Sequence, residues 1–257
     1  MIVKISRDKL KSMILESVGR ILRESEGDMD SMYFDAYKRG DEKTAYGLVR
    51  DAAASVMPET KVLDSDGKPL MMTHCTDNEG FYKFDRSKIG TGQGQAFLGA
   101  GFNFSRGYGS SVYGKRGIRA FLNAKNPLRN DNLTLSGYSI KRAIMALDTM
   151  SSERVEDSWG DMQSAVKSLL QTGNDLDVYA AITMVYFGNH SDVLEVFEKM
   201  GYDSTIEYDD SGNIMNAVVF SSNQIKSAEP FTFGEDGKLI PLSERFDLNN
   251  DDIRYEE

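Results

Sequence analysis

Cysteine and histidine, the usual ligands of structural zinc, are scarce in this sequence. Its 257 residues include a single cysteine, Cys75, and two histidines. One cysteine cannot form an internal disulfide, which favours a reducing compartment. A structural zinc site needs about four Cys or His ligands. We therefore expect no metal.

Basic charge and long apolar runs are also lacking. The chain has 30 Lys+Arg against 40 Asp+Glu, a formal net charge of −10 and a pI of about 4.9. Nucleic-acid-binding proteins typically carry a basic patch or a basic pI, so no nucleic-acid partner is expected. The longest apolar run, residues 178–187, is too short to span a bilayer, and no signal peptide is evident, so we expect no membrane partner.

The motifs of several common enzyme classes are absent. The run GTGQG at residues 90–94 lacks the Lys-Ser/Thr ending of a phosphate-binding loop. Neither a GxSxG elbow nor an HExxH motif occurs. Because adjacent residues on a strand point to opposite faces, His74 and Cys75 do not form a nucleophile pair. No acidic cluster has the spacing of a metal site, which disfavours a metal-dependent hydrolase or nuclease.

A helical pattern is present at the N-terminus. Apolar residues at helical spacing predict an amphipathic helix over residues 6–24, within a separate unit of residues 1–25. The acidic stretch 24–30 is typical of a linker. Two interpretations stay open: the helix docks on the domain or on a second copy, or it is a detachable segment that binds a partner.

The main domain is predicted over residues 40–257. The expected helices cover residues 33–38, 42–56, 139–150, 162–170, 178–187 and 192–200, the last four within a helical insertion at about 133–200. The expected strands cover residues 61–63, 70–73, 118–122, 205–208 and 216–220, with turns at 64–67 and 209–213. This order of helix, strands, helices and strands predicts an α+β fold.

Five segments stand out from this background. His74 ends the first apolar strand and is followed by Cys75-Thr76. The remaining four are GAGFNFS at 99–105, SSVYG at 110–114, NAVVFSSNQIKS at 216–227, and a tail with FD at 246–247 and DIRY at 252–255.

In this order the segments resemble the ADP-ribosyltransferase-like domains of phage and mobile-element polyvalent proteins. These domains have the His-Tyr-Glu type of fold, similar to diphtheria toxin and poly(ADP-ribose) polymerases. The resemblance covers about 40–130 and 200–257. It implies an ADP-ribosyltransferase-like split antiparallel β core, preceded by N-terminal helices and interrupted by the helical insertion.

The resemblance also implies NAD+ as the substrate and assigns roles to residues. Catalytic roles fall to His74 and Asn216, and contacts with NAD+ to His74, Cys75, Thr76, Asn103, Ser110 and Tyr113. His74 would bind the ribose next to adenine, the Cys75 backbone and Ser110 the nicotinamide carboxamide, and Tyr113 the nicotinamide ring.

Three positions depart from the family pattern. Cys75 replaces a glycine, Asn103 replaces a stacking tyrosine, and Asn216 replaces the catalytic glutamate. An amide accepts a hydrogen bond from a ribose hydroxyl but cannot act as a base. Other carboxylates of the same predicted hairpin are candidates for that role, namely Glu207, Asp209 and Asp210.

Two functions therefore stay open. The first is a phage-type mono-ADP-ribosyltransferase that uses NAD+ to modify a protein target in the bacterial host cytoplasm. The second is a catalytically inactive relative that acts as a binding or virion-cargo protein. The expected partners are NAD+, an unidentified protein target, and either a phage virion or a second copy bound through the N-terminal helix.

Overall fold

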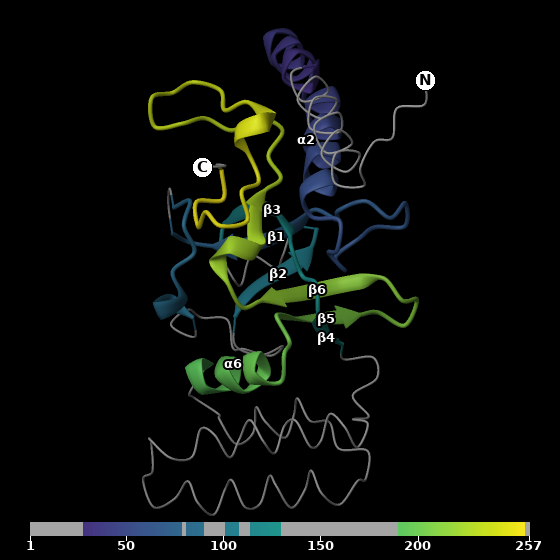
Figure 1. The fold of residues 1–257 in the computed structure, drawn as a ribbon, viewed down its shortest axis with the longest axis vertical. Helices are drawn as coiled ribbons and strands as arrows, with labels where there is room; N and C mark the ends of the chain where they lie inside the picture. Colours follow the sequence, from purple (N-terminus) through teal and green to yellow (C-terminus); the bar gives the residue numbers. More distant parts are fainter. Residues whose placement is uncertain (1–27, 79–80, 90–100, 108–113, 130–189, 255–257) are drawn as a thin grey trace, which may run out of the picture.

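The computed structural model describes residues 28–78, 81–89, 101–107, 114–129 and 190–254 (Figure 1). Seven strands form one sheet in the order β4-β5-β6-β2-β1-β3-β7. Their bounds are β1 Met72–Thr76, β2 Phe102–Arg106, β3 Arg116–Leu122, β4 Pro127–Arg129, β5 Ser204–Tyr208, β6 Ile214–Val219 and β7 Ile225–Ser227. All neighbouring strands are antiparallel apart from β4 and β5, which run parallel.

The sheet is split between β1 and β2. β1 pairs with β3 along its whole length, from Met72 to Thr76. With β2 it shares only two residue pairs, Met72 with Arg106 and Thr73 with Ser105. One half of the sheet thus contains β1, β3 and β7, and the other contains β4, β5, β6 and β2. The expected α+β fold with a split β core is confirmed.

Both faces of the sheet are buried over part of their area. Because successive side chains of a strand point to opposite faces, Ala120 and Leu122 of β3 enter one hydrophobic core and Phe121 enters another. The first core also contains Met72, Phe84, Phe102, Phe104, Ile206, Ala217, Val219 and Ile225. The second joins the sheet to the N-terminal helices.

Two helices cover the end of the sheet near β3 and β7 (Figure 1). Residues 28–39 are helical, and α2 follows over Glu42–Val56. Asp41 caps α2 by accepting a hydrogen bond from the Thr44 backbone N–H at 3.1 Å. The small apolar stripe of α2 packs on the sheet through Ala45, Val49, Ala52 and Ala53. Both predicted helices are confirmed, and the first is longer than predicted, because residues 28–32 are also helical.

The first predicted hairpin is present but short. A bridge between Leu63 and Pro69 and a backbone hydrogen bond of 3.0 Å from the Leu70 N–H to the Val62 oxygen join its two arms. The strand instead begins at Met72 and continues to Thr76, because five residues find partners on β3. His74 therefore lies in the middle of β1 and not at its end, which corrects the expectation from sequence. The strand predicted over 118–122 is confirmed and begins earlier, at Arg116.

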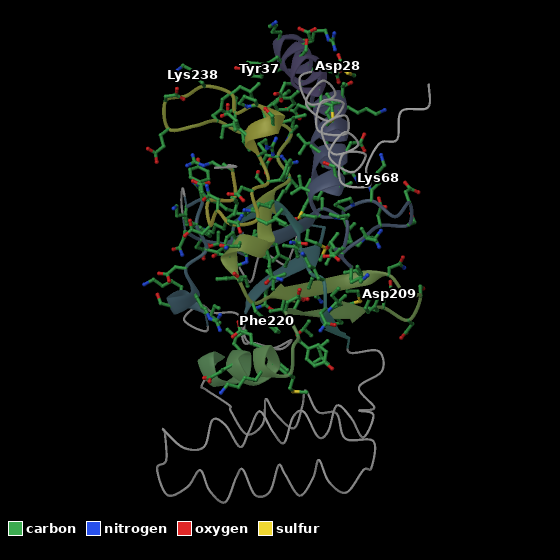
Figure 2. The ribbon with its side chains drawn as sticks, viewed as in Figure 1. Asp28, Tyr37, Lys68, Asp209, Phe220 and Lys238 are labelled. Atoms are coloured by element: carbon green, nitrogen blue, oxygen red, sulfur yellow. The ribbon has the colours of Figure 1, made fainter. Side chains whose placement is uncertain are left out.

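The second predicted hairpin is confirmed. β5 and β6 pair across the turn at residues 209–213, where the Asp209 carboxylate accepts hydrogen bonds from the backbone N–H groups of Ser211 and Asn213 at 2.9 and 2.8 Å. Figure 2 shows Asp209 at the outer tip of this hairpin.

The predicted insertion leaves the sheet at one strand and returns at its neighbour. β4 and β5 flank it in sequence and pair directly, Pro127 with Ser204. Its last predicted helix corresponds to α6 (His190–Lys199). The helices predicted over 6–24, 139–150, 162–170 and 178–187 lie outside the described residues. The described residues also contain short 3₁₀ helices, namely η1 Arg86–Lys88, η4 Ser222–Gln224 and η5 Leu242–Glu244. In the described part of the chain, none of the helices has the length and apolar character needed to cross a membrane.

Candidate functional site

His74 spans the split between β1 and β2. Its Nδ1 lies 2.8 Å from the backbone oxygen of Asn103, so a side chain of β1 bonds to β2 where the strand pairing has stopped. A carbonyl oxygen can only accept, so Nδ1 carries the proton in the neutral ring. Nε2 is then an acceptor, and it has no hydrogen-bond partner among the residues that the structure describes.

Aromatic rings surround His74. Its ring centroid lies 6.5 Å from that of Phe81, 5.1 Å from that of Phe84 and 5.5 Å from that of Phe104. This burial lowers the pKa of His74 below its ordinary value of 6.5, partly opposed by the bond to Asn103. His74 is therefore neutral at pH 7, which leaves Nε2 ready to accept a hydrogen bond. Sequence reasoning missed Phe81 and Phe84, although two aromatics so soon after the strand were a visible signal.

One edge of β1 is open beyond Thr73. In the described residues no strand pairs with His74, Cys75 or Thr76 on the side of β2. Backbone N–H and C=O groups at such an edge need other partners, and a ligand amide is one kind of partner. This fits the role in carboxamide binding that the family resemblance gives to Cys75. Thr76 itself is buried.

A glycine packs against the end of β1. A Cβ built on Gly114 would lie 2.3 to 2.5 Å from the backbone N, Cα and C atoms of Thr76, and the Gly114 φ is +137°. Only glycine allows this approach. Ser110 and Tyr113 lie outside the described residues, but the residue that follows Tyr113 is thus in direct contact with β1.

Three other site candidates, Cys75, Asn103 and Asn216, lie on the face of the sheet opposite to the His74 side chain. Thr73 pairs with Ser105, and Ser105 pairs with Asn216, so these three side chains share one face. Alternation places Cys75 and Asn103 on that same face and His74 on the opposite one. The side chains of His74 and Asn216 therefore lie two strands apart, and the structure does not bring them together on one surface.

Asn216 has a partner on the neighbouring strand. It pairs in register with Glu207 of β5, and its Nδ2 donates a hydrogen bond of 2.5 Å to Glu207 Oε2. Both side chains are half-buried. The sequence identified Glu207 only as one of three carboxylates on this hairpin, and the register singles it out.

The glycine of the GFNF segment has a packing role. A Cβ on Gly101 would lie 2.5 Å from Val218 Cγ1 and 2.8 Å from the Val219 backbone oxygen, and the Gly101 φ is +142°. Glycine here lets the start of β2 reach β6. Asn103, two residues on, is exposed and donates from Nδ2 to the Gly101 backbone oxygen at 3.2 Å.

One family model matches the chain. It describes the ADP-ribosyltransferase in polyvalent proteins and covers residues 64–233, more than half of the sequence. The chain belongs to this family. No curated protein and no solved structure matches it.

The polyvalent ADP-ribosyltransferase match includes the split in the sheet and the whole β5–β6 hairpin. It also runs through the predicted insertion, which the resemblance seen in the sequence had left unexplained. The description of the family indicates an ADP-ribosyltransferase domain, so the expectation from the sequence motifs is confirmed at the level of family and fold.

The described residues fit the substrate that this ADP-ribosyltransferase family implies. Nε2 of His74 is an acceptor without a partner in the described chain and suits a ribose hydroxyl. The open edge of β1 offers backbone groups to a carboxamide, and Asn216 offers an amide oxygen. These placements leave the roles of His74, Cys75, Thr76, Asn103 and Asn216 as predictions.

Proposed function

We propose that this protein is a phage-type mono-ADP-ribosyltransferase that uses NAD+ to modify a protein of the bacterial host. The observation that carries the proposal is the neutral His74 at the split of the sheet, in a chain that belongs to this family. His74 contributes an acceptor atom, and the unpaired edge of β1 contributes backbone donors and acceptors. Together they suit a dinucleotide with ribose hydroxyls at one end and a carboxamide at the other.

The chain's own residues would bind, orient and shield the substrate. The rings of Phe81, Phe84 and Phe104 pack around the His74 imidazole and hold it in place. The bond to Asn103 fixes the tautomer of that imidazole. Holding both ends of NAD+ fixes the orientation of the bond to be broken before the acceptor attacks.

We expect such a protein to act in the host cytoplasm and to reach it either by synthesis there or with the virion. The N-terminal segment of residues 1–25 is the part that would bind the virion or a second copy. A host protein that offers a nucleophilic side chain is the expected target.

A second function is favoured by Asn103 and Asn216. Neither residue supplies the aromatic face or the negative charge that the family pattern has at these positions. On this alternative the chain binds a partner or travels as virion cargo without catalysis. NAD+ binding without turnover would identify it.

The test measures binding and transfer separately. NAD+ should raise the melting temperature of the purified protein, because a ligand of the folded state stabilises it by mass action. His74→Phe keeps the aromatic packing but removes both ring nitrogens, so it should remain folded and lose the shift. Incubation with labelled NAD+ and host lysate should label at least one protein, and His74→Phe should abolish the label.

Each result has a different consequence. A melting temperature that stays constant up to millimolar NAD+ contradicts NAD+ use. A shift that His74→Phe removes, without label on any protein and without nicotinamide release, supports the binding alternative.

A further inference from the structure

We infer that Glu207, held in place by Asn216, is the carboxylate that stabilises the cationic ribose and accepts the proton of the attacking group. The inference rests on the proposed function, because that function defines the reaction. It assigns the missing negative charge to the strand next to the one that carries Asn216.

The position of Glu207 supports this assignment. Four strands bring a row of polar side chains onto one face, and the registers Thr73–Ser105, Ser105–Asn216 and Asn216–Glu207 define the row. Neighbours in such a row have Cβ atoms about 4.5–5.5 Å apart. Glu207 Oε2 accepts the bond from Asn216 Nδ2 at 2.5 Å, so the carboxylate lies beside the amide that stands at the family glutamate position.

An irregularity in the hairpin creates this arrangement. Tyr208 pairs with Ile214, and a regular ladder would then place Glu207 opposite Met215. The register shifts between Glu207 and Tyr208, so Glu207 meets Asn216 and the extra residue, Met215, is left 43% exposed. Such bulges re-aim side chains and are enriched beside active sites.

No other strand residue can supply the charge. Of the residues in β1 to β7, all of which the structure describes, Glu207 is the one Asp or Glu. Asp209 is committed to the turn, where its carboxylate accepts bonds from Ser211 and Asn213. Asp210 is exposed at the hairpin tip.

The chemistry divides between the amide and the carboxylate. The bond between ribose C1 and the nicotinamide nitrogen breaks, and its electron pair leaves with nicotinamide, which becomes neutral. The positive charge passes to the ribose until a lone pair of an acceptor O–H or N–H bonds to C1. Glu207 stabilises that charge and takes the acceptor's proton, while the oxygen of the Asn216 amide accepts from a ribose hydroxyl.

The test uses nicotinamide release from NAD+ by the full-length protein, with water as the acceptor. Glu207→Gln keeps the shape and removes the charge, so release should fall about 10²–10³-fold, while the NAD+ thermal shift remains. Glu235→Gln makes the same change at an exposed position outside the sheet and should release nicotinamide at the wild-type rate.

A double variant tests the arrangement itself. Glu207→Gln combined with Asn216→Glu keeps an amide bonded to a carboxylate and exchanges the two positions. It should recover at least about tenfold over Glu207→Gln alone, because the two sites act as one unit. If Glu207→Gln does not fold, the double variant decides. Nicotinamide release by the double variant supports the inference. A double variant that shows the NAD+ thermal shift but releases no nicotinamide overturns it.

Two failures can be told apart. Undiminished release by Glu207→Gln overturns the role of Glu207 and leaves the proposed transferase standing. A wild-type protein that neither binds NAD+ nor releases nicotinamide overturns both.

Discussion

At the scale of single residues, the site depends on close backbone approach as much as on polar groups. Gly114 touches the backbone of Thr76 at the open end of β1. The contact joins the segment that follows Tyr113 to the strand that carries His74 and Cys75. A side chain at position 114 therefore disturbs the candidate site directly.

Gly114→Ala should destabilise the fold by about 2–4 kcal/mol, since the added Cβ meets backbone and the φ is unfavourable for alanine. Gly212→Ala is the matched control, because its φ of +78° is also positive but nothing lies within 4 Å of the added Cβ. It should cost only about 1 kcal/mol. Denaturant unfolding measures both, and equal losses would show that the contact with Thr76 is unimportant.

At the scale of elements, the helix over residues 28–39 belongs to the folded domain. The Asp30 carboxylate accepts bonds from the Ser243 backbone N–H at 3.1 Å and from its hydroxyl at 2.5 Å. Tyr33 is fully buried, and its hydroxyl accepts a bond of 3.2 Å from Arg245 Nη1. These contacts join the helix to the C-terminal part of the chain, so we expect the stable domain to begin before residue 30.

Two truncations test this boundary. Removing residues 1–25 should leave a soluble protein that melts cooperatively, because every contact named above is kept. Removing residues 1–40 should lower stability by several kcal/mol, since it deletes Tyr33 and leaves buried Arg245 without one of its partners. Calorimetry distinguishes the two, and a molten product of the shorter truncation would place the N-terminal segment in the core.

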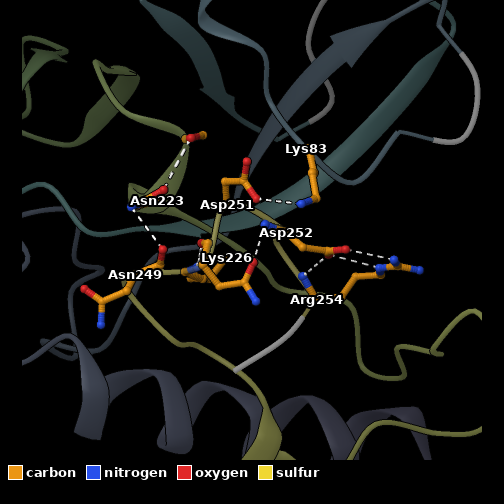
Figure 3. Close-up of polar contacts among 9 residues, drawn as sticks. Lys83, Asn223, Lys226, Asn249, Asp251, Asp252 and Arg254 are labelled. Atoms are coloured by element: carbon orange, nitrogen blue, oxygen red, sulfur yellow. Dashed lines mark hydrogen bonds and ion pairs between the residues drawn. The ribbon is translucent and has the colours of Figure 1, made fainter. Parts of the chain in front are cut away.

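At the scale of the whole molecule, the C-terminal tail ties distant parts together. The Ile253 backbone N–H donates to the Tyr82 oxygen at 2.9 Å, and the Ile253 oxygen accepts from the Ser227 N–H at 2.8 Å. Figure 3 shows the polar contacts around these bonds, among them Lys83 with Asp251 at 2.8 Å. The tail thus joins β7 to the segment that follows β1.

Lys226 is buried beneath this tail. Its Nζ donates to the Asn250 oxygen at 2.6 Å, and its side chain has no exposed surface. Burial lowers the pKa of Lys226 to about 8, partly opposed by Asp247, Asp252 and Asp251.

Global stability should therefore depend on pH in the alkaline range. Between pH 8 and 10.5 the unfolded chain holds the Lys226 proton more tightly than the folded one, so the free energy of unfolding rises with pH. The rise relative to Lys226→Met should be on the order of 1–3 kcal/mol. Melting curves across this range measure it, and parallel profiles for the two proteins would contradict it.

Local patterns in the sequence were enough to predict much of the fold. The stripe of α2, the turn at residues 209–213 and the strand over 118–122 depend on neighbours within a few residues, and all three are confirmed. The order of the motifs was enough to identify the family. In each case the information lies in residue types at fixed spacing, which a chain carries before it folds.

Strand pairing decided the rest. His74 lies in mid-strand because β3 offers five partners, and it faces away from Asn216 because pairing through Ser105 fixes which residues share a face. Glu207 meets Asn216 through a one-residue shift in the hairpin. Since side chains alternate with a period of two, a single extra residue changes which groups meet, and only the assembled sheet determines where that residue is placed.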